Sequence, residues 1–270
     1  MVVQHNLTAM NSNRMLGITT GQQAKSAEKL SSGYKINRAG DDAAGLSISE
    51  KMRSQIRGLN KASKNAQDGV SLIQTAEGAL NEAHSILQRM NELAVQAAND
   101  TNTSADRDAL QKEIDALTSE IDRIASTTQF NTKNLLNGSF TSKNLQVGAL
   151  SGQAITITIG TMDAEALSIQ SLDVSSFGKA GSAMTKVQAA ISRVSQQRSA
   201  LGAIQNRLEH TIANLDNISE NTQAAESRIR DTDMAAEMVE YSKNNILAQA
   251  GQSMLAQANQ ATQGVLALLQ

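Results

Sequence analysis

The sequence contains no proline among its 270 residues, although an average chain of this length would carry roughly a dozen. Proline removes a backbone donor and interrupts helices, so its absence favours long uninterrupted helices. Aromatic residues make up only 2% of the chain and tryptophan is absent, which argues against a core filled mainly by large flat side chains. These absences predict helices that pack through thin seams of Ala, Leu, Ile and Met.

Cysteine is also absent, which excludes disulfides, thiolate metal sites and thiol nucleophiles. The 24 basic and 26 acidic residues give a net charge of -2, and this balance argues against a nucleic-acid partner bound by phosphate neutralisation. The first residues, Met1 to Asn6, contain neither a basic segment nor a long apolar run. No signal peptide of the secretory type is therefore predicted.

Charged side chains are missing from the whole C-terminal stretch between Asn244 and Gln270. A membrane span is not expected, because Asn and Gln recur through this stretch and a span needs about 20 predominantly apolar residues. An uncharged, amide-rich helix has little to keep it apart from similar helices in water, so it is expected to lie in a packed assembly. If that assembly is a polymer of this chain, the residues predicted for its core are Leu247, Met254, Val265 and Leu268.

Hydrophobic periodicity is strongest in the first half of the chain. Apolar or small residues follow one another at alternating intervals of four and three, a repeat typical of a left-handed coiled coil. The positions are Ala62, Ala66, Gly69, Ile73, Ala76, Leu80, Ala83, Leu87, Met90, Ala94 and Ala97. The many Ala and Gly residues in this stripe predict a close approach of the neighbouring helices.

Two further helical stripes accompany the first. After a polar turn at 99–104, in which Thr103 or Ser104 can cap a helix, apolar residues recur from Leu110 to Ile124. They recur again from Met184 to Ile218. Between these stripes, period-two alternation on both sides of the turn at 150–153 predicts a β-hairpin.

The fold predicted from these patterns is mainly α: a long antiparallel helical bundle or coiled coil with a small β-hairpin region at 130–180. The bundle domain is expected to span 43–224. Residues 1–42 and 225–270 are expected to form a separate terminal helical domain.

Charged connectors join the bundle to the terminal segments. Asp41 or Asp42 is expected to cap the first long helix, and Asp231 or Asp233 the last one. The junction residues also include three arginines, and their pairing with the aspartates across the two connectors is predicted, in particular that of Arg230 with Asp41 or Asp42. The complete predicted junction set is Arg38, Asp41, Asp42, Arg228, Arg230 and Asp231.

Candidate catalytic groups are few. The three histidines, His5, His84 and His210, stand far apart, without the spacing that binds zinc. The aspartates of the connectors could supply metal ligands or an acid/base pair, but helix capping accounts for them more simply. The sequence predicts no enzyme, no cofactor and no metal site, and it points instead to interaction.

Several long motifs resemble bacterial flagellin. They cover 29–52 and 67–80 in the N-terminal half, and 201–210, 225–231 and 254–259 in the C-terminal half. The resemblance extends over about residues 1–140 and 181–270. It implies a short flagellin without the outer variable domains, because only the residues at about 141–180 connect the two similar parts. It also implies that the terminal helices pack as an inner coiled coil in the polymer.

The resemblance also implies a function and partners. The expected function is that of a structural subunit that polymerises with itself into the extracellular flagellar filament used for motility. Export by the flagellar type III route, without a cleaved signal peptide, is implied as well. So are an export chaperone on the C-terminal helix at about 235–270, and contacts with the filament cap and hook-associated proteins.

Recognition by a vertebrate Toll-like receptor is a further implication of the resemblance. The matching motif is Leu87–Val95, and the contacts by position are Arg89, Leu93 and Glu113. Where the family commonly has a second arginine, this chain has Asn91.

Two alternatives to a filament subunit remain open on the sequence. A hook-filament junction protein would be similar at both ends. A signalling coiled coil of the chemoreceptor type would share the Ala-rich, proline-free composition, although the β-like middle argues against it.

Overall fold

The computed structural model describes residues 6–267, and the helices dominate it as the absence of proline predicts. The chain forms two compact units. One contains residues 55–220, and the other combines the residues up to Ser54 with those from Asn221 onward. Both boundaries lie inside continuous helices, and the terminal unit takes in more of these helices than the predicted 1–42 and 225–270.

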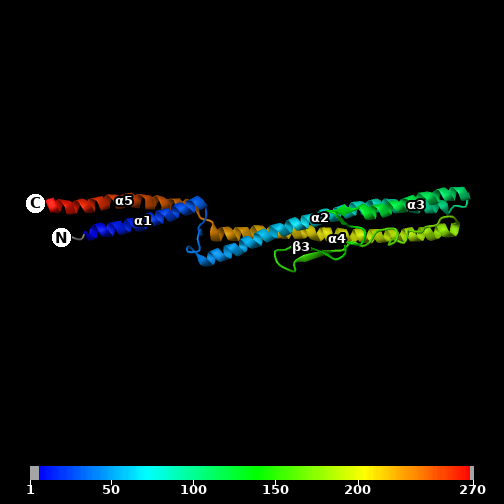
Figure 1. The fold of residues 1–270 in the computed structure, drawn as a ribbon, viewed down its shortest axis with the longest axis horizontal. Helices are drawn as coiled ribbons and strands as arrows, with labels where there is room; N and C mark the ends of the chain where they lie inside the picture. The colour runs from blue at the N-terminus through cyan, green and yellow to red at the C-terminus, as the bar shows by residue number, and fades with distance from the viewer. Residues whose placement is uncertain (1–5, 268–270) are drawn as a thin grey trace. The chain divides into compact units, whose positions relative to one another are not determined.

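Three helices form the bundle unit (Figure 1): α2 (Ala43–Ala97), α3 (Ser104–Thr127) and α4 (Phe177–Arg230). Every position of the predicted 62–97 stripe is buried, and its larger side chains Ile73, Leu80, Leu87 and Met90 have no exposed surface. One contiguous core joins residues of all three helices with residues of the β region. The seven-residue repeat therefore marks the face that α2 buries.

The turn between α2 and α3 follows the predicted capping chemistry. The Thr103 hydroxyl accepts a hydrogen bond from the backbone N–H of Asp106 at 3.3 Å, and the Asp106 carboxylate accepts one from the Thr103 N–H at 2.9 Å. Arg107 then donates to the Ala97 carbonyl at 3.1 Å, at the C-terminal end of α2. A short polar turn closed in this way makes the two helices antiparallel.

The predicted hairpin consists of β3 (Lys143–Gln146) and β4 (Ala154–Ile157), paired antiparallel with Leu145 opposite Ile155. It approaches α2 at two glycines. A Cβ placed on Gly58 would lie 2.9 Å from the Ala149 Cβ, and one on Gly69 would overlap Leu145. A smaller hairpin that the sequence did not reveal pairs β1 (Gln129–Phe130) with β2 (Lys133–Asn134).

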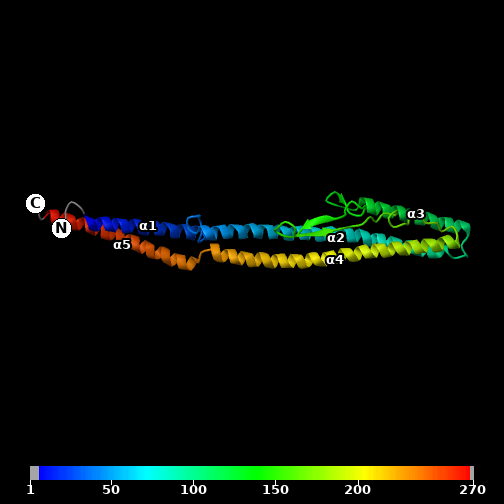
Figure 2. The same cartoon turned by 90° about the horizontal axis from the view of Figure 1, so that it is seen from below.

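The terminal unit pairs α1 (Leu7–Ser32) with α5 (Met234–Ala267), which lie side by side in Figures 1 and 2. Asn6 donates to the Ala258 carbonyl at 3.0 Å, near one end of the pair. Lys29 and Glu237 lie 3.6 Å apart near the other. These contacts, in opposite order along the two helices, make the pair antiparallel.

Candidate functional site

The seam between α1 and α5 has a seven-residue repeat made mostly of small or polar residues. The less exposed positions of the two helices alternate at intervals of three and four residues. They are Ala9, Ser12, Leu16, Thr19, Gln23, Ser26 and Leu30 on α1, and Glu237, Tyr241, Asn244, Ala248, Gly251, Leu255 and Ala258 on α5. Such a seam brings two helices close together but buries little apolar surface. The stability of the pair in isolation is correspondingly low.

Most of the large apolar side chains of the same two helices lie outside this seam. Ten of them are about half exposed or more, and we refer to them together as the outward terminal surface. This surface consists of Leu7, Met10, Met15 and Ile18 on α1, with Met234, Met238, Val239, Ile246, Leu247 and Met254 on α5. A folded protein rarely leaves so many large apolar groups on one pair of helices in water unless another molecule covers them.

Two of the four residues predicted for the polymer core belong to this surface. Leu247 is 50% exposed and Met254 is 59% exposed. Val265 lies in α5, but its side chain and the whole of Leu268 fall outside the described residues. The α1 members were not predicted from the sequence, although the intervals of three and five residues between Leu7, Met10, Met15 and Ile18 place them on one helix face.

Backbone hydrogen bonds join the two charged connectors. The Lys35 N–H donates to the Arg230 carbonyl at 2.7 Å, and the Thr232 N–H donates to the Gly33 carbonyl at 3.0 Å. The Arg230 guanidinium lies 4.4 Å from the centre of the Tyr34 ring, a distance at which cation and ring attract. The connectors therefore lie side by side, as the sequence predicted.

The predicted pairing of Arg230 with Asp41 or Asp42 is wrong. The Asp41 carboxylate instead accepts hydrogen bonds from the backbone N–H groups of Arg38 and Asn37, which lower its pKa. Asp42 accepts from the Gly45 N–H at 2.9 Å and caps α2. Backbone donors a few residues away satisfy both carboxylates locally, so neither reaches across to an arginine.

Arg38 and Asp231 also make contacts within their own segments. Arg38 binds Glu28 of α1, with Nε 3.0 Å from Oε1. The Asp231 carboxylate accepts a hydrogen bond from the Ser227 hydroxyl at 2.6 Å, and Arg228 is exposed. Asp233 caps α5 by accepting from the N–H groups of Ala235 and Ala236, which confirms the predicted capping role.

The residues of the expected receptor contact lie on two neighbouring bundle helices. Arg89 of α2 reaches Glu113 of α3 at 2.9 Å and Glu92 at 3.2 Å. The hydrogen bond that Arg89 donates to Glu113 is the largest of the contacts that raise the pKa of Arg89. Leu93 is only 1% exposed and belongs to the bundle core, so the structure offers Arg89 and Glu113 at the surface but not Leu93.

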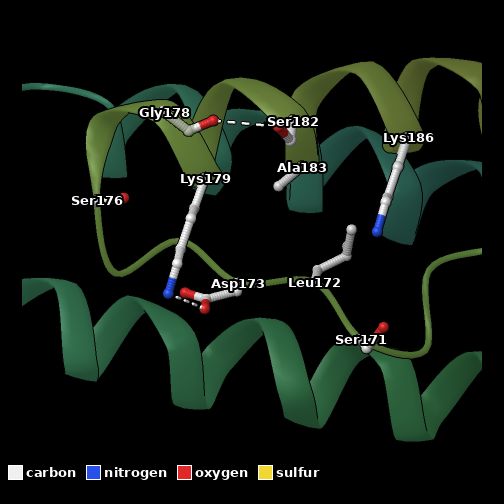
Figure 3. A pocket seen from close by; sticks show the side chains of 9 residues that line it. All are labelled: Ser171, Leu172, Asp173, Ser176, Gly178, Lys179, Ser182, Ala183 and Lys186. Atoms are coloured by element: carbon white, nitrogen blue, oxygen red, sulfur yellow. Dashed lines mark hydrogen bonds and ion pairs between the residues drawn. The ribbon is translucent and has the colours of Figure 1, made fainter.

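A hollow of about 490 Å³ lies beside the N-terminal turns of α4 (Figure 3). Lys179 donates to the Asp173 carboxylate at 2.7 Å, and this bond contributes most to lowering the pKa of Asp173. The rest of the lining consists of serine hydroxyls, Gly178, Leu172, Ala183 and Lys186. Its only carboxylate is already held by a lysine, so the lining lacks a free general base.

The part of the chain that the structure describes lacks both a cluster of metal ligands and a membrane-spanning helix. Within it, no group of three or more His, Asp or Glu side chains could hold a metal ion. None of the helices between residues 6 and 267 combines the length and apolar character that crossing a membrane requires.

Comparison with known proteins agrees with the helical architecture at both ends of the chain. The bacterial flagellin N-terminal helical region matches residues 3–141, and the bacterial flagellin C-terminal helical region matches residues 184–269. A flagellin of Halalkalibacterium halodurans is 58% identical over 271 residues, and a flagellin of Bacillus subtilis is 52% identical over 304 residues. Both alignments cover 100% of this chain and 100% of the relative.

Solved structures show the same fold. The crystal structure of Bacillus cereus flagellin superimposes with a TM-score of 0.50 at 35% identity, over 56% of this chain and 88% of that one. A putative flagellar hook-associated protein from Vibrio parahaemolyticus gives a TM-score of 0.60 over 71% of this chain and 100% of its own. Its identity is only 12%, so it shares the fold alone. The full-length sequence identities and both matched regions show that the chain belongs to the bacterial flagellin family.

Proposed function

We propose that this flagellin, a structural subunit of the bacterial flagellar filament, assembles by burying its outward terminal surface against other copies of itself. The supporting observation is the contrast between the two faces of the α1 and α5 pair. The face that the pair buries within one chain carries mostly small and polar side chains, whereas most of the large apolar side chains remain outside. Contacts between copies would supply the burial that one chain lacks, and a repeated contact of this kind builds a helical polymer.

The test compares two serine substitutions at equally exposed apolar positions. Ile246 of α5 is 67% exposed, and Leu150 in the hairpin turn is 68% exposed. Neither substitution removes a core contact of the free subunit, so both variants should fold. Purified variants are added to preformed wild-type filament seeds, elongation is followed by electron microscopy, and the subunit concentration left in solution at the plateau is measured.

Ile246→Ser should raise that residual concentration about thirtyfold, because an interface that buries the isoleucine loses about 2 kcal/mol. Leu150→Ser should elongate seeds like the wild type. If both variants left the same subunit concentration in solution, whether raised or unchanged, the proposed role of the outward terminal surface in assembly would be contradicted.

We further propose how the subunit reaches the filament, which is extracellular. It leaves the cell by the flagellar type III route, and an export chaperone covers α5 until assembly. The exposed apolar residues of α5 support the need for such a cover. The filament cap and hook-associated proteins are proposed as the contacts at the ends of the polymer. Flagellins are structural proteins, and we propose no catalytic role for this chain.

A second proposed role is recognition by a vertebrate Toll-like receptor through Arg89 and Glu113. The exposed position of their ion pair supports it. Arg89→Ala should weaken receptor-dependent signalling in reporter cells. Arg123→Ala removes a comparable exposed ion pair with Glu120 and serves as the matched control. Unchanged signalling by the Arg89 variant would contradict this role.

A further inference from the structure

Methionine is distributed unevenly over the structure. Half of the ten methionines of the chain lie on the outward terminal surface, with exposed fractions from 48% at Met234 to 65% at Met10. In the bundle, by contrast, Met90 has no exposed surface and Met162 is 9% exposed. The side chains that the filament would bury are therefore the ones that an unassembled subunit presents to solvent.

The chemistry of the thioether gives this distribution a consequence. A methionine sulfur attacks one oxygen of hydrogen peroxide, an S–O bond forms and the O–O bond breaks. The sulfur loses two electrons, and the second oxygen leaves as water. The product is a polar sulfoxide, which methionine sulfoxide reductases convert back to the thioether. Because the chain contains no cysteine and no tryptophan, its exposed methionines are the groups most readily oxidised by a mild peroxide.

We propose that Met10, Met15, Met234, Met238 and Met254 form an oxidation site for small peroxides that is open in the unassembled subunit and closed in the filament, and that their sulfoxides block assembly. This inference rests on the proposal that the outward terminal surface is the contact between copies.

The block follows from the cost of burying polar groups. Methionine fits an irregular helix interface because its side chain is flexible and apolar. A sulfoxide carries an oxygen that must lose its water when the surface is covered, and an apolar interface offers it few donors. The free subunit keeps its fold, because all five methionines lie outside both hydrophobic cores.

The first experiment measures where peroxide acts. Wild-type subunits and wild-type filaments are treated with the same dilute hydrogen peroxide, and sulfoxide at each methionine is quantified by peptide mass spectrometry. In the free subunit the five methionines should oxidise about tenfold faster than Met90. In the filament they should oxidise about tenfold more slowly than in the free subunit, while Met90 stays slow in both.

The second experiment measures the effect on assembly. Peroxide-treated subunits should elongate untreated seeds only at a subunit concentration raised about tenfold, which corresponds to about 1.4 kcal/mol per subunit. Circular dichroism should be unchanged. Treatment with both classes of methionine sulfoxide reductase should restore elongation. A variant with all five positions changed from Met to Leu should elongate equally well with and without peroxide.

The outcomes separate the two proposals. If the five methionines oxidise as fast in the filament as in the free subunit, the outward terminal surface is not the filament contact and both proposals fail. If they are protected in the filament but the oxidised subunit elongates seeds normally, only the oxidation block is overturned. The proposal that sulfoxides block assembly is also overturned if reductase treatment does not restore elongation. This measurement uses the wild-type protein alone.

Discussion

At the residue scale, the start of α3 depends on one reciprocal pair of hydrogen bonds. Thr103 and Asp106 exchange hydrogen bonds that satisfy two backbone donors at once. Thr103→Ala should lower the free energy of unfolding by about 1 kcal/mol, the usual cost of losing such a cap. Chemical denaturation measures this loss. Thr101→Ala, in the same turn but outside the capping pair, should have a much smaller effect.

The same pair predicts a dependence on pH. The Thr103 hydroxyl, followed by the Thr103 N–H, lowers the pKa of Asp106 below its ordinary 3.8. The carboxylate therefore binds protons less readily in the folded state. Its contribution to stability is full well above pH 3.8 and is lost as the pH falls through the folded-state pKa. In the Thr103→Ala variant the pKa should return toward 3.8, which an NMR titration would detect; an unmoved pKa would contradict the capping assignment.

Glycine at position 58 is explained by the hairpin turn that lies against it. A Cβ at this position would stand 2.9 Å from the Ala149 Cβ and 3.3 Å from the Ala149 Cα, so Ala149 would have to move with its backbone. Gly58→Ala should reduce the free energy of unfolding by about 1–3 kcal/mol through this overpacking, and should speed hydrogen exchange in the hairpin.

A glycine elsewhere on α2 provides the control for this prediction. Nothing lies within 4 Å of a Cβ built on Gly78, so Gly78→Ala should stabilise the chain by about 0.5–1 kcal/mol through helix propensity alone. If both substitutions changed stability in the same direction, the close approach of the hairpin would not explain Gly58.

At the scale of the elements, the junction between the connectors depends on a cation over an aromatic ring. A double-mutant cycle with Arg230→Ala and Tyr34→Ala should give a coupling of about 0.5–1 kcal/mol in unfolding free energy. A cycle that joins Arg230→Ala with Asp41→Ala should be additive, because Asp41 binds backbone donors of its own segment. If Arg230 were instead coupled to Asp41 and additive with Tyr34, the contact of Arg230 with the Tyr34 ring would not hold the junction together.

An element could be predicted from the sequence when its hydrophobic pattern repeated over many residues. The stripe of α2 follows a single period over five heptads and is buried throughout. Strands β1 and β2 have two residues each, too few for alternation. Their only local feature is the turn at Asn131 and Thr132, which both have positive φ, and threonine seldom marks such a turn.

The candidate site was harder to predict for a different physical reason. In α1 and α5 two faces compete: small and polar residues form the seam within the chain, and large apolar residues occupy the outside. Neither face therefore forms a single clear apolar stripe in the sequence. The absence of charge after residue 243 predicts that α5 packs in an assembly, but only the structure separates Leu247 and Met254 on its outside from Ala248 in the seam.

At the scale of the whole molecule, the two units differ in how much apolar surface each buries within one chain. Residues 55–220 hold a contiguous core of large aliphatic side chains. In the terminal unit, the buried hydrophobic residues among those described are only Ile36 and Ala248. Folding of the bundle and assembly of the filament should therefore be separable by changes confined to the terminal helices.

Deleting residues 250–270 tests that separation. The truncated chain loses Gly251, whose position is packed closely by Leu16, and Ala258, whose carbonyl binds Asn6. The N-terminal half of α1 thus loses its partner together with the last turns of α5. The core of the bundle contains none of the deleted residues, so its thermal unfolding, followed by circular dichroism, should keep its midpoint. Seeded elongation should be abolished. A truncated chain that still formed normal filaments would show that subunits join through another surface.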